Sequence, residues 1–190
     1  AEAFKTSSNY DTAIFGYFNR KERIEAFRES INDSFQLRYG ENPHQKGIFY
    51  GNPGKIFDKL NGKEISYNNL LDIDAALALI DDFTETTFAV VKHNNACGVA
   101  SREDPMAAWT DALACDPVSA YGGIIVCNTG IDDNIASEID KIFFEIIIAP
   151  DFTERALEIL KQKKNRIILK RKTVTNPGYT YRSLLNGVLW

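Results

Sequence analysis

The chain has 190 residues and a formal net charge of −4, from 22 basic and 26 acidic residues. That balance lacks the basic excess typical of a nucleic-acid or anionic-membrane surface, and no apolar run approaches the roughly 18 residues of a membrane span. With three cysteines, no CxxC and two histidines, the chain predicts no metal site and a reducing compartment. We therefore expect a cytoplasmic protein with no nucleic-acid or membrane partner.

Residues 1–34 are predicted to form a helical lead-in or interdomain linker. The chain begins without methionine or a signal-peptide pattern, so we interpret its start as an internal point of a longer protein. Ser8 to Asp11 offers helix caps, and the charged segment from Lys21 to Glu29 continues the helical character. The main domain is expected over residues 35–190.

A polar loop over residues 37–45 is the first candidate functional segment, because glycine and proline there interrupt regular structure. Arg38 could bind a phosphate, and Tyr39 could stack on a nucleotide or hydrogen-bond to it. An exposed arginine and a packed tyrosine are the alternative. His44 could serve as a second acid or base, or simply hold the turn.

After a short strand at 47–50 and a turn at 51–54, the chain settles into a regular alternation. Apolar residues at helical spacing predict a helix up to Ile80, capped by Asn68 or Asn69. Strands rich in Ile and Val then alternate with helices, which predicts an α/β fold with a largely parallel sheet covered on both faces. The expected strands are 87–92, 123–127, 145–149 and 166–170, and the expected helices are 105–114, 131–143 and 153–162.

The run from Phe88 to Gly98 is the most informative, because an apolar strand ends in a cation, an imidazole and two amides. In open α/β sheets ligands bind beyond the carboxyl ends of strands, so Lys92 and His93 are expected beside a substrate. A base that titrates near neutrality next to a cation suits proton transfer with stabilisation of a developing negative charge. A solvated lysine and a histidine bonded to a carbonyl are the structural alternative.

Other features are weaker. Gly122 and Gly123 before a strand allow a close approach by a ligand but also fit an ordinary turn. The basic cluster Lys161, Lys163, Lys164 and Arg166 is more typical of a solvated helix end than of a phosphate site. A zinc deaminase needs an HxE ligand pattern that His93 lacks, and Cys97 is better explained as a small buried thiol than as a nucleophile.

Five ordered motifs together resemble the transformylase part of a bienzyme family that joins phosphoribosylaminoimidazolecarboxamide (AICAR) formyltransferase to IMP cyclohydrolase. They are Leu37-Arg-Tyr-Gly-Glu-Asn-Pro-His-Gln45, Gly62-Lys-Glu-Ile-Ser-Tyr-Asn-Asn69, Val91-Lys-His-Asn-Asn-Ala-Cys-Gly98, Asp116-Pro-Val-Ser-Ala-Tyr-Gly-Gly123 and Glu145-Ile-Ile-Ile-Ala-Pro150. Ala96 and Tyr121 depart mildly from the family's usual proline and phenylalanine.

The resemblance implies purine biosynthesis by formyl transfer from the cosubstrate 10-formyltetrahydrofolate to the 5-amino group of AICAR, without a metal. The histidine matching His93 is the family's proton acceptor, and the lysine matching Lys92 stabilises the oxyanion or assists the folate leaving group. Arg38, Tyr39, Gly122 and Glu145 match positions at the nucleotide. A homodimer is implied for the complete protein.

The resemblance also implies a cytidine-deaminase-like layered α/β fold with a largely parallel sheet. By this resemblance we expect the chain to be the first half of a duplicated domain, with folate-binding residues carried by a second half in the relatives. A formyltransferase segment, inactive in isolation, is the leading interpretation. A noncatalytic nucleotide-binding or assembly fragment is the alternative, and a zinc deaminase has little support.

Overall fold

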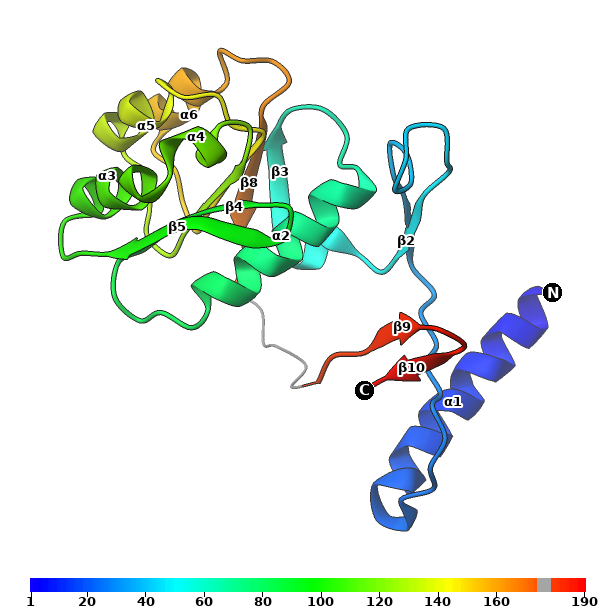
Figure 1. Ribbon diagram of the computed structural model, residues 1–190. Helices are drawn as coiled ribbons and strands as arrows, with labels where there is room; N and C mark the ends of the chain where they lie inside the picture. Colours follow the sequence, from blue (N-terminus) through cyan, green and yellow to red (C-terminus); the bar gives the residue numbers. More distant parts are fainter. Residues whose placement is uncertain (174–178) are drawn as a thin grey trace. The chain divides into compact units, whose positions relative to one another are not determined.

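The computed structural model (Figure 1) describes residues 1–173 and 179–190, which divide into two compact units. Unit 1 holds residues 1–35, 49–52 and 179–190, and unit 2 holds residues 36–48 and 53–173. A separate two-stranded sheet pairs β1 (Ser34–Gln36) with β2 (Ile48–Tyr50), which confirms the short strand expected at 47–50. No helix among the described residues is long and apolar enough to cross a membrane.

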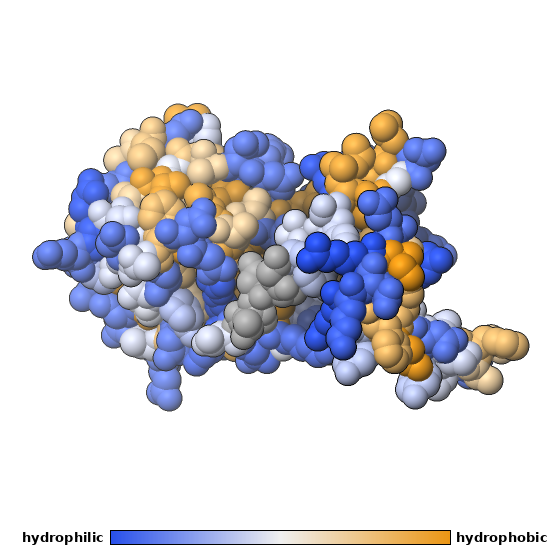
Figure 2. Space-filling model, turned by 90° about the horizontal axis from the view of Figure 1, so that it is seen from below, coloured by the Kyte–Doolittle hydropathy of each residue, from blue (hydrophilic) through white to orange (hydrophobic). Residues whose placement is uncertain are grey.

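Unit 1 contains helix α1 (Glu2–Glu22) and an antiparallel hairpin of β9 (Arg182–Leu184) and β10 (Gly187–Leu189). The expected cap at Ser8 is wrong, because the helix starts at Glu2 and the Ser8 hydroxyl donates back to the Lys5 carbonyl at 3.3 Å. The expected continuation to residue 29 is also wrong, since Arg23 ends the helix in a left-handed conformation with φ of 56°. No residue of α1 is buried, and Figure 2 shows hydrophobic side chains at the surface of this unit.

Unit 2 is built on one six-stranded sheet with the order β3-β8-β7-β6-β4-β5. Strands β6, β7 and β8 are parallel neighbours, whereas β3 and β4 are antiparallel to the strands beside them. Strand β5 pairs antiparallel with β4, so four of the six strands run in one direction. The strands are β3 (Phe57–Asn61), β4 (Thr87–Lys92), β5 (Asn95–Ser101), β6 (Ile124–Cys127), β7 (Ile146–Ala149) and β8 (Ile167–Arg171).

Helices cover both faces of this sheet (Figure 1), because alternate strand residues point to opposite sides and the central strands β6 and β7 are apolar throughout. One face packs against α2 (Tyr67–Ile80). The other packs against α3 (Pro105–Cys115), α5 (Asp133–Ile139) and α6 (Glu154–Leu160), with the short α4 (Pro117–Ala120) beside them. The layered α/β class with a mostly parallel sheet is therefore confirmed.

Strand β5 was not predicted, and it changes the path of the chain after His93. We expected the strand over 87–92 to lead through a loop to the next helix, but a tight turn sends the chain back along β4. Gly98 allows the returning strand to pack closely on α3, because a Cβ there would lie 2.0 Å from the Ala112 carbonyl oxygen. The segment between Asn95 and the helix at Pro105 contains small residues and Gly98, so its sequence did not indicate a strand.

The expected cap of α2 is wrong by two or three residues. Ser66, not Asn68 or Asn69, is the N-cap, and its hydroxyl accepts a hydrogen bond from the backbone N–H of Asn69 at 3.3 Å. The Asn69 side-chain oxygen in turn accepts from the Ser66 backbone N–H at 3.2 Å, completing a capping box. The expected cap of α3 by Asp104, with Pro105 in its first position, is confirmed.

Candidate active site

The predicted site residues gather along one edge of the six-stranded sheet. Strand β4 is antiparallel to β6, so its carboxyl end meets the amino end of β6, where Val91 pairs with Ile124. The parallel register then aligns the amino ends of β7 and β8, with Ile146 between Ile124 and Ile167. In strand order, this edge carries Lys63 after β3, Arg166 before β8, Glu145 before β7, Gly122 before β6, and Lys92 and His93 at the end of β4.

This edge differs from the one we expected. The carboxyl-end rule applies to parallel strands, and here the carboxyl end of an antiparallel strand joins the amino ends of three parallel ones. Lys92 and His93 still lie at their strand's end, as predicted. The neighbouring groups come from the loops that enter β6, β7 and β8.

His93 and Asn94 form the two-residue turn between β4 and β5. Both have positive φ, at 51° and 64°, which is the conformation of a type I′ hairpin turn. Positive φ is uncommon for a residue with a side chain, and among such residues asparagine, aspartate and histidine adopt it most often. The turn leaves the His93 side chain exposed, and the His93 carbonyl accepts from the Asn95 side chain at 2.8 Å.

Lys92 is held beside the start of β6. Its ammonium donates to the Tyr121 carbonyl oxygen at 2.8 Å, and the side chain is half-buried. The next residue, Gly122, has φ of 77°, a left-handed conformation that favours glycine, and its N–H donates to the Phe143 carbonyl at 2.8 Å. The fixed cation expected next to His93 is therefore tied to the loop that contains Gly122.

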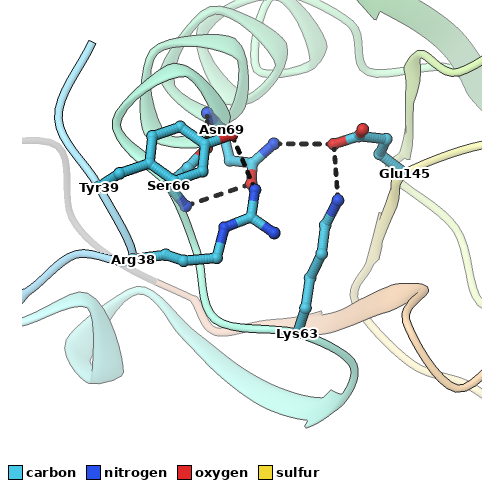
Figure 3. A network of polar contacts seen from close by, with 6 residues as sticks. All are labelled: Arg38, Tyr39, Lys63, Ser66, Asn69 and Glu145. Atoms are coloured by element: carbon cyan, nitrogen blue, oxygen red, sulfur yellow. Dashed lines mark hydrogen bonds and ion pairs between the residues drawn. The ribbon is translucent and has the colours of Figure 1, made fainter. Parts of the chain in front are cut away.

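Glu145 is the centre of a network between the sheet and α2 (Figure 3). Its Oε2 accepts a hydrogen bond from the Asn69 side-chain nitrogen at 3.2 Å and forms an ion pair with Lys63 Nζ at 3.5 Å. The capping box with Ser66 fixes the orientation of the Asn69 amide, so its nitrogen faces the carboxylate. A helix cap thereby orients an acidic side chain 76 residues further along the chain.

Arg38 and Tyr39 form a compact pair in the same view. The Arg38 guanidinium donates to the Tyr39 hydroxyl at 2.8 Å and lies 4.6 Å from the centre of the ring. The Arg38 backbone N–H donates to the Ile65 carbonyl, which ties this segment to the entry of α2. The arginine is exposed and the tyrosine half-buried, so both remain accessible to a ligand.

An open pocket of about 620 Å³ lies between these groups. Its lining combines several cations with the single carboxylate of Glu145, and with aromatic and amide side chains. The lining residues are Arg38, Lys63, Phe143, Phe144, Glu145, Gln162, Lys163, Lys164, Asn165 and Arg166. The lysines after α6 are exposed, as expected of a solvated helix end, and they also line a pocket suited to an anion.

Arg166 has a structural role in the wall of this pocket. Its side chain is only 2% exposed, donates to Asp140 at 2.6 Å and to the Leu160 carbonyl at 3.2 Å, and lies 4.0 Å from the centre of the Phe144 ring. Because Asp140 neutralises this guanidinium, the cations of the lining that remain for a ligand are Arg38, Lys163 and Lys164, while Lys63 is shared with Glu145.

Cys97 lies on β5 and has the properties of a protected thiol. Burial raises its pKa, the Asp116 carboxylate raises it further, and the Lys92 ammonium opposes both effects. A raised pKa keeps the thiol protonated near neutrality, which weakens it as a nucleophile. In residues 1–173 and 179–190, no group of three or more His, Cys, Asp or Glu side chains is arranged to hold a metal ion.

The structure brings five of the six predicted site residues to one sheet edge or its pocket, and Tyr39 joins them through Arg38. His44 is exposed in the 42–45 turn and is not among the residues that line the pocket. Sequence reasoning gave Lys63 no role and considered Asn69 only as a helix cap. The serine followed three residues later by asparagine was a readable capping signal, but nothing in the sequence pairs Asn69 with Glu145.

The family model and the related proteins that match this chain indicate the same family. The model of the family described as AICARFT/IMPCHase bienzyme matches residues 1–190. Relatives named bifunctional purine biosynthesis protein PurH match the chain, and three of them are compared with it. The one from Bacteroides thetaiotaomicron is 63% identical over 188 residues, which cover 99% of this chain and 37% of the relative.

The other two relatives are more distant but cover similar regions. The protein from Acetivibrio thermocellus is 45% identical over 184 residues, with 92% of this chain and 36% of the relative covered. The protein from Petrotoga mobilis is 42% identical over 199 residues, with 100% and 39% covered. The chain thus spans about two fifths of the length of these relatives. Because the family model covers the whole chain, the chain belongs to the AICARFT/IMPCHase bienzyme family of purine biosynthesis.

Proposed function

We propose that this segment carries the nucleotide site and the proton-transfer pair of AICAR formyltransferase. In the reaction, the 5-amino nitrogen of AICAR forms a bond to the formyl carbon of 10-formyltetrahydrofolate, and the bond from that carbon to folate N10 breaks. The amine loses a proton, and N10 gains one as tetrahydrofolate leaves. An aromatic amine is a weak nucleophile, so removal of its proton is where catalysis is most needed.

His93 is the proposed proton acceptor, and Lys92 the proposed cation at the oxyanion or at the folate leaving group. The two are adjacent, but the turn and the strand present them differently. His93 is exposed at the turn, where a substrate amine can reach its imidazole, whereas Lys92 is half-buried and fixed at the Tyr121 carbonyl. A preorganised cation stabilises a developing negative charge with little reorganisation.

The proposed contacts to AICAR are Arg38, Tyr39, Gly122 and Glu145. The cationic pocket suits the nucleotide's phosphate, with Arg38 able to offer a planar guanidinium. Glu145, held through Oε2 by Asn69 and Lys63, is oriented to accept hydrogen bonds from a ribose hydroxyl. Apart from the proposed role of Lys92 at the reacting atoms, we assign no residue of this segment to folate binding, and a homodimer of the complete protein remains a prediction.

The observation that most supports this proposal is the shared sheet edge. The expected acid–base pair and the expected anion site come from distant parts of the sequence, yet the strand register aligns them in one row. Formyl transfer requires a base near one end of AICAR and an anion site for the other. Positioning of this kind contributes roughly 7 to 11 kcal/mol to a bimolecular reaction.

The test is formyl transfer by a full-length protein that contains this segment, with His93→Ala as the variant and His44→Ala as the matched control. We expect His93→Ala to lower turnover about 100-fold to 10,000-fold, because a general base contributes that much, and to leave AICAR affinity nearly unchanged. His44→Ala should behave like the parent protein.

Near-normal turnover of His93→Ala would contradict the assignment. A full-length protein that binds AICAR but transfers no formyl group would instead favour the alternative, a noncatalytic nucleotide-binding segment. The isolated segment should bind AICAR weakly and show little or no turnover, because catalysis requires both substrates to be held together.

A further inference from the structure

We propose that Asp72 of α2 is a positioning residue that holds the turn carrying His93. This inference rests on the proposed role of His93. Asp72 Oδ1 accepts a hydrogen bond from the backbone N–H of Asn94 at 2.8 Å, and Asp72 is half-buried. With the Asn94 amide oriented so that its nitrogen faces these acceptors, the side chain also donates to Asp72 Oδ1 and to the Leu71 carbonyl, both at 3.1 Å.

The turn needs such support because of its backbone conformation. His93 and Asn94 both have positive φ, and the histidine is the less tolerant of the two, since asparagine enters this region more readily. Sequences that favour a type I′ turn usually place glycine at the second position, where this chain has Asn94. A charge-assisted hydrogen bond to the Asn94 N–H compensates for part of that deficit.

Helix α2 connects this turn to the nucleotide pocket. Asn69 and Asp72 are three residues apart, so they lie on the same side of the helix. Asn69 binds the Glu145 carboxylate, and Asp72 binds the turn of His93. One rigid turn of helix therefore sets the position of the proposed base relative to a proposed nucleotide contact, which lie on different loops.

The experiment compares Asp72→Ala with Asp72→Asn in a full-length protein that contains this segment. Asparagine keeps an oxygen that can accept the Asn94 N–H, so it should rescue what alanine loses. Asp74→Ala is the matched control, because Asp74 is an exposed aspartate of the same helix. Both alanine variants gain the same helix propensity, so that effect cancels.

Two readouts are needed, hydrogen exchange of residues 91–97 and steady-state kinetics. We expect Asp72→Ala to exchange roughly tenfold faster in this segment and to have an about tenfold lower kcat with little change in the KM for AICAR. Asp72→Asn and Asp74→Ala should stay near the parent in both readouts. Equal exchange in Asp72→Ala and Asp74→Ala would overturn the inference, as would faster exchange with an unchanged kcat.

A second variant tests whether Asp72 acts through the turn. Asn94→Gly keeps the backbone N–H and makes positive φ inexpensive, so the turn should depend less on α2. The kcat loss caused by Asp72→Ala should then be clearly smaller in the Asn94→Gly background, and an equal loss would contradict the inference. His93→Ala decides the proposed function separately, because exchange in residues 91–97 reports the turn whatever the chemistry of His93.

Discussion

The two ends of the site are built in different ways, although they share one sheet edge. At one end, Lys92 and His93 are adjacent in sequence, and a hairpin turn with a bond from α2 presents them. At the other end, the pocket is assembled from segments near residues 38, 63, 145 and 163–166. The proposed chemistry is therefore carried by local structure, whereas the proposed binding site exists only in the folded sheet. Substitutions should therefore separate turnover from affinity and stability.

The largest expected effect is a loss of stability in the wall of the pocket, caused by Asp140→Ala. This change leaves the Arg166 guanidinium buried without its carboxylate, and loss of one partner of a buried pair costs about 3 to 5 kcal/mol. Urea denaturation of the chain measures the free energy of unfolding. Glu158→Ala, which breaks the exposed ion pair with Arg155, should cost less than about 1 kcal/mol. If both variants lowered the free energy of unfolding by the same amount, the pocket wall would not depend on the pairing of Arg166 with Asp140.

At the turn, Lys92→Ala should lower kcat by about 100-fold to 1,000-fold in a full-length protein that contains the segment. The reason is that a cation aimed at a developing oxyanion acts mainly in the transition state. Lys164→Ala is the informative control, since this lysine lines the pocket and should weaken AICAR binding more than it slows turnover. A raised KM with an unchanged kcat for Lys92→Ala would contradict its proposed role.

The smallest of these effects is expected from Arg38→Ala, which should weaken AICAR binding by roughly 10-fold to 100-fold. That range corresponds to the loss of one or two hydrogen bonds to a charged group. Arg38→Lys should fall between parent and alanine, because an ammonium lacks the planar fork of the guanidinium. Calorimetry measures the affinity, with Arg155→Ala as a control outside the pocket. Unaltered affinity would remove Arg38 from the nucleotide site.

Much of the fold was predictable because its signals are local. The strand at Thr87–Lys92 was predicted with its observed bounds, and strands β6, β7 and β8 within one or two residues, since buried strands of Ile and Val between helices are distinctive. The helix expected over 131–143 is shorter, Asp133–Ile139, because Asp132 caps its start and the chain leaves helical geometry after Asp140. Apolar spacing alone does not mark such an end.

The site was predictable residue by residue but not in its arrangement. Lys92 ends a strand that is recognisable by its apolar run, and His93 follows it, but the left-handed turn formed by His93 and Asn94 contains no glycine that would indicate it in the sequence. The network of Lys63, Asn69 and Glu145 depends on the order of the strands in the sheet. The local sequence does not reveal that order, so it could not pair Asn69 with Glu145. The cytidine-deaminase-like topology and the position of this segment within a duplicated domain remain predictions.

The most direct test of the division between turn and pocket is a crossed measurement on one pair of variants. For His93→Ala and Arg38→Ala, in a full-length protein that contains the segment, the AICAR dissociation constant is measured by calorimetry and the formyl-transfer rate in single turnover at saturating substrates. The account predicts a rate loss of at least about 100-fold with near-parent affinity for His93→Ala. For Arg38→Ala it predicts weaker affinity with a near-parent saturated rate. Variants that lose affinity and rate in the same proportion would contradict it.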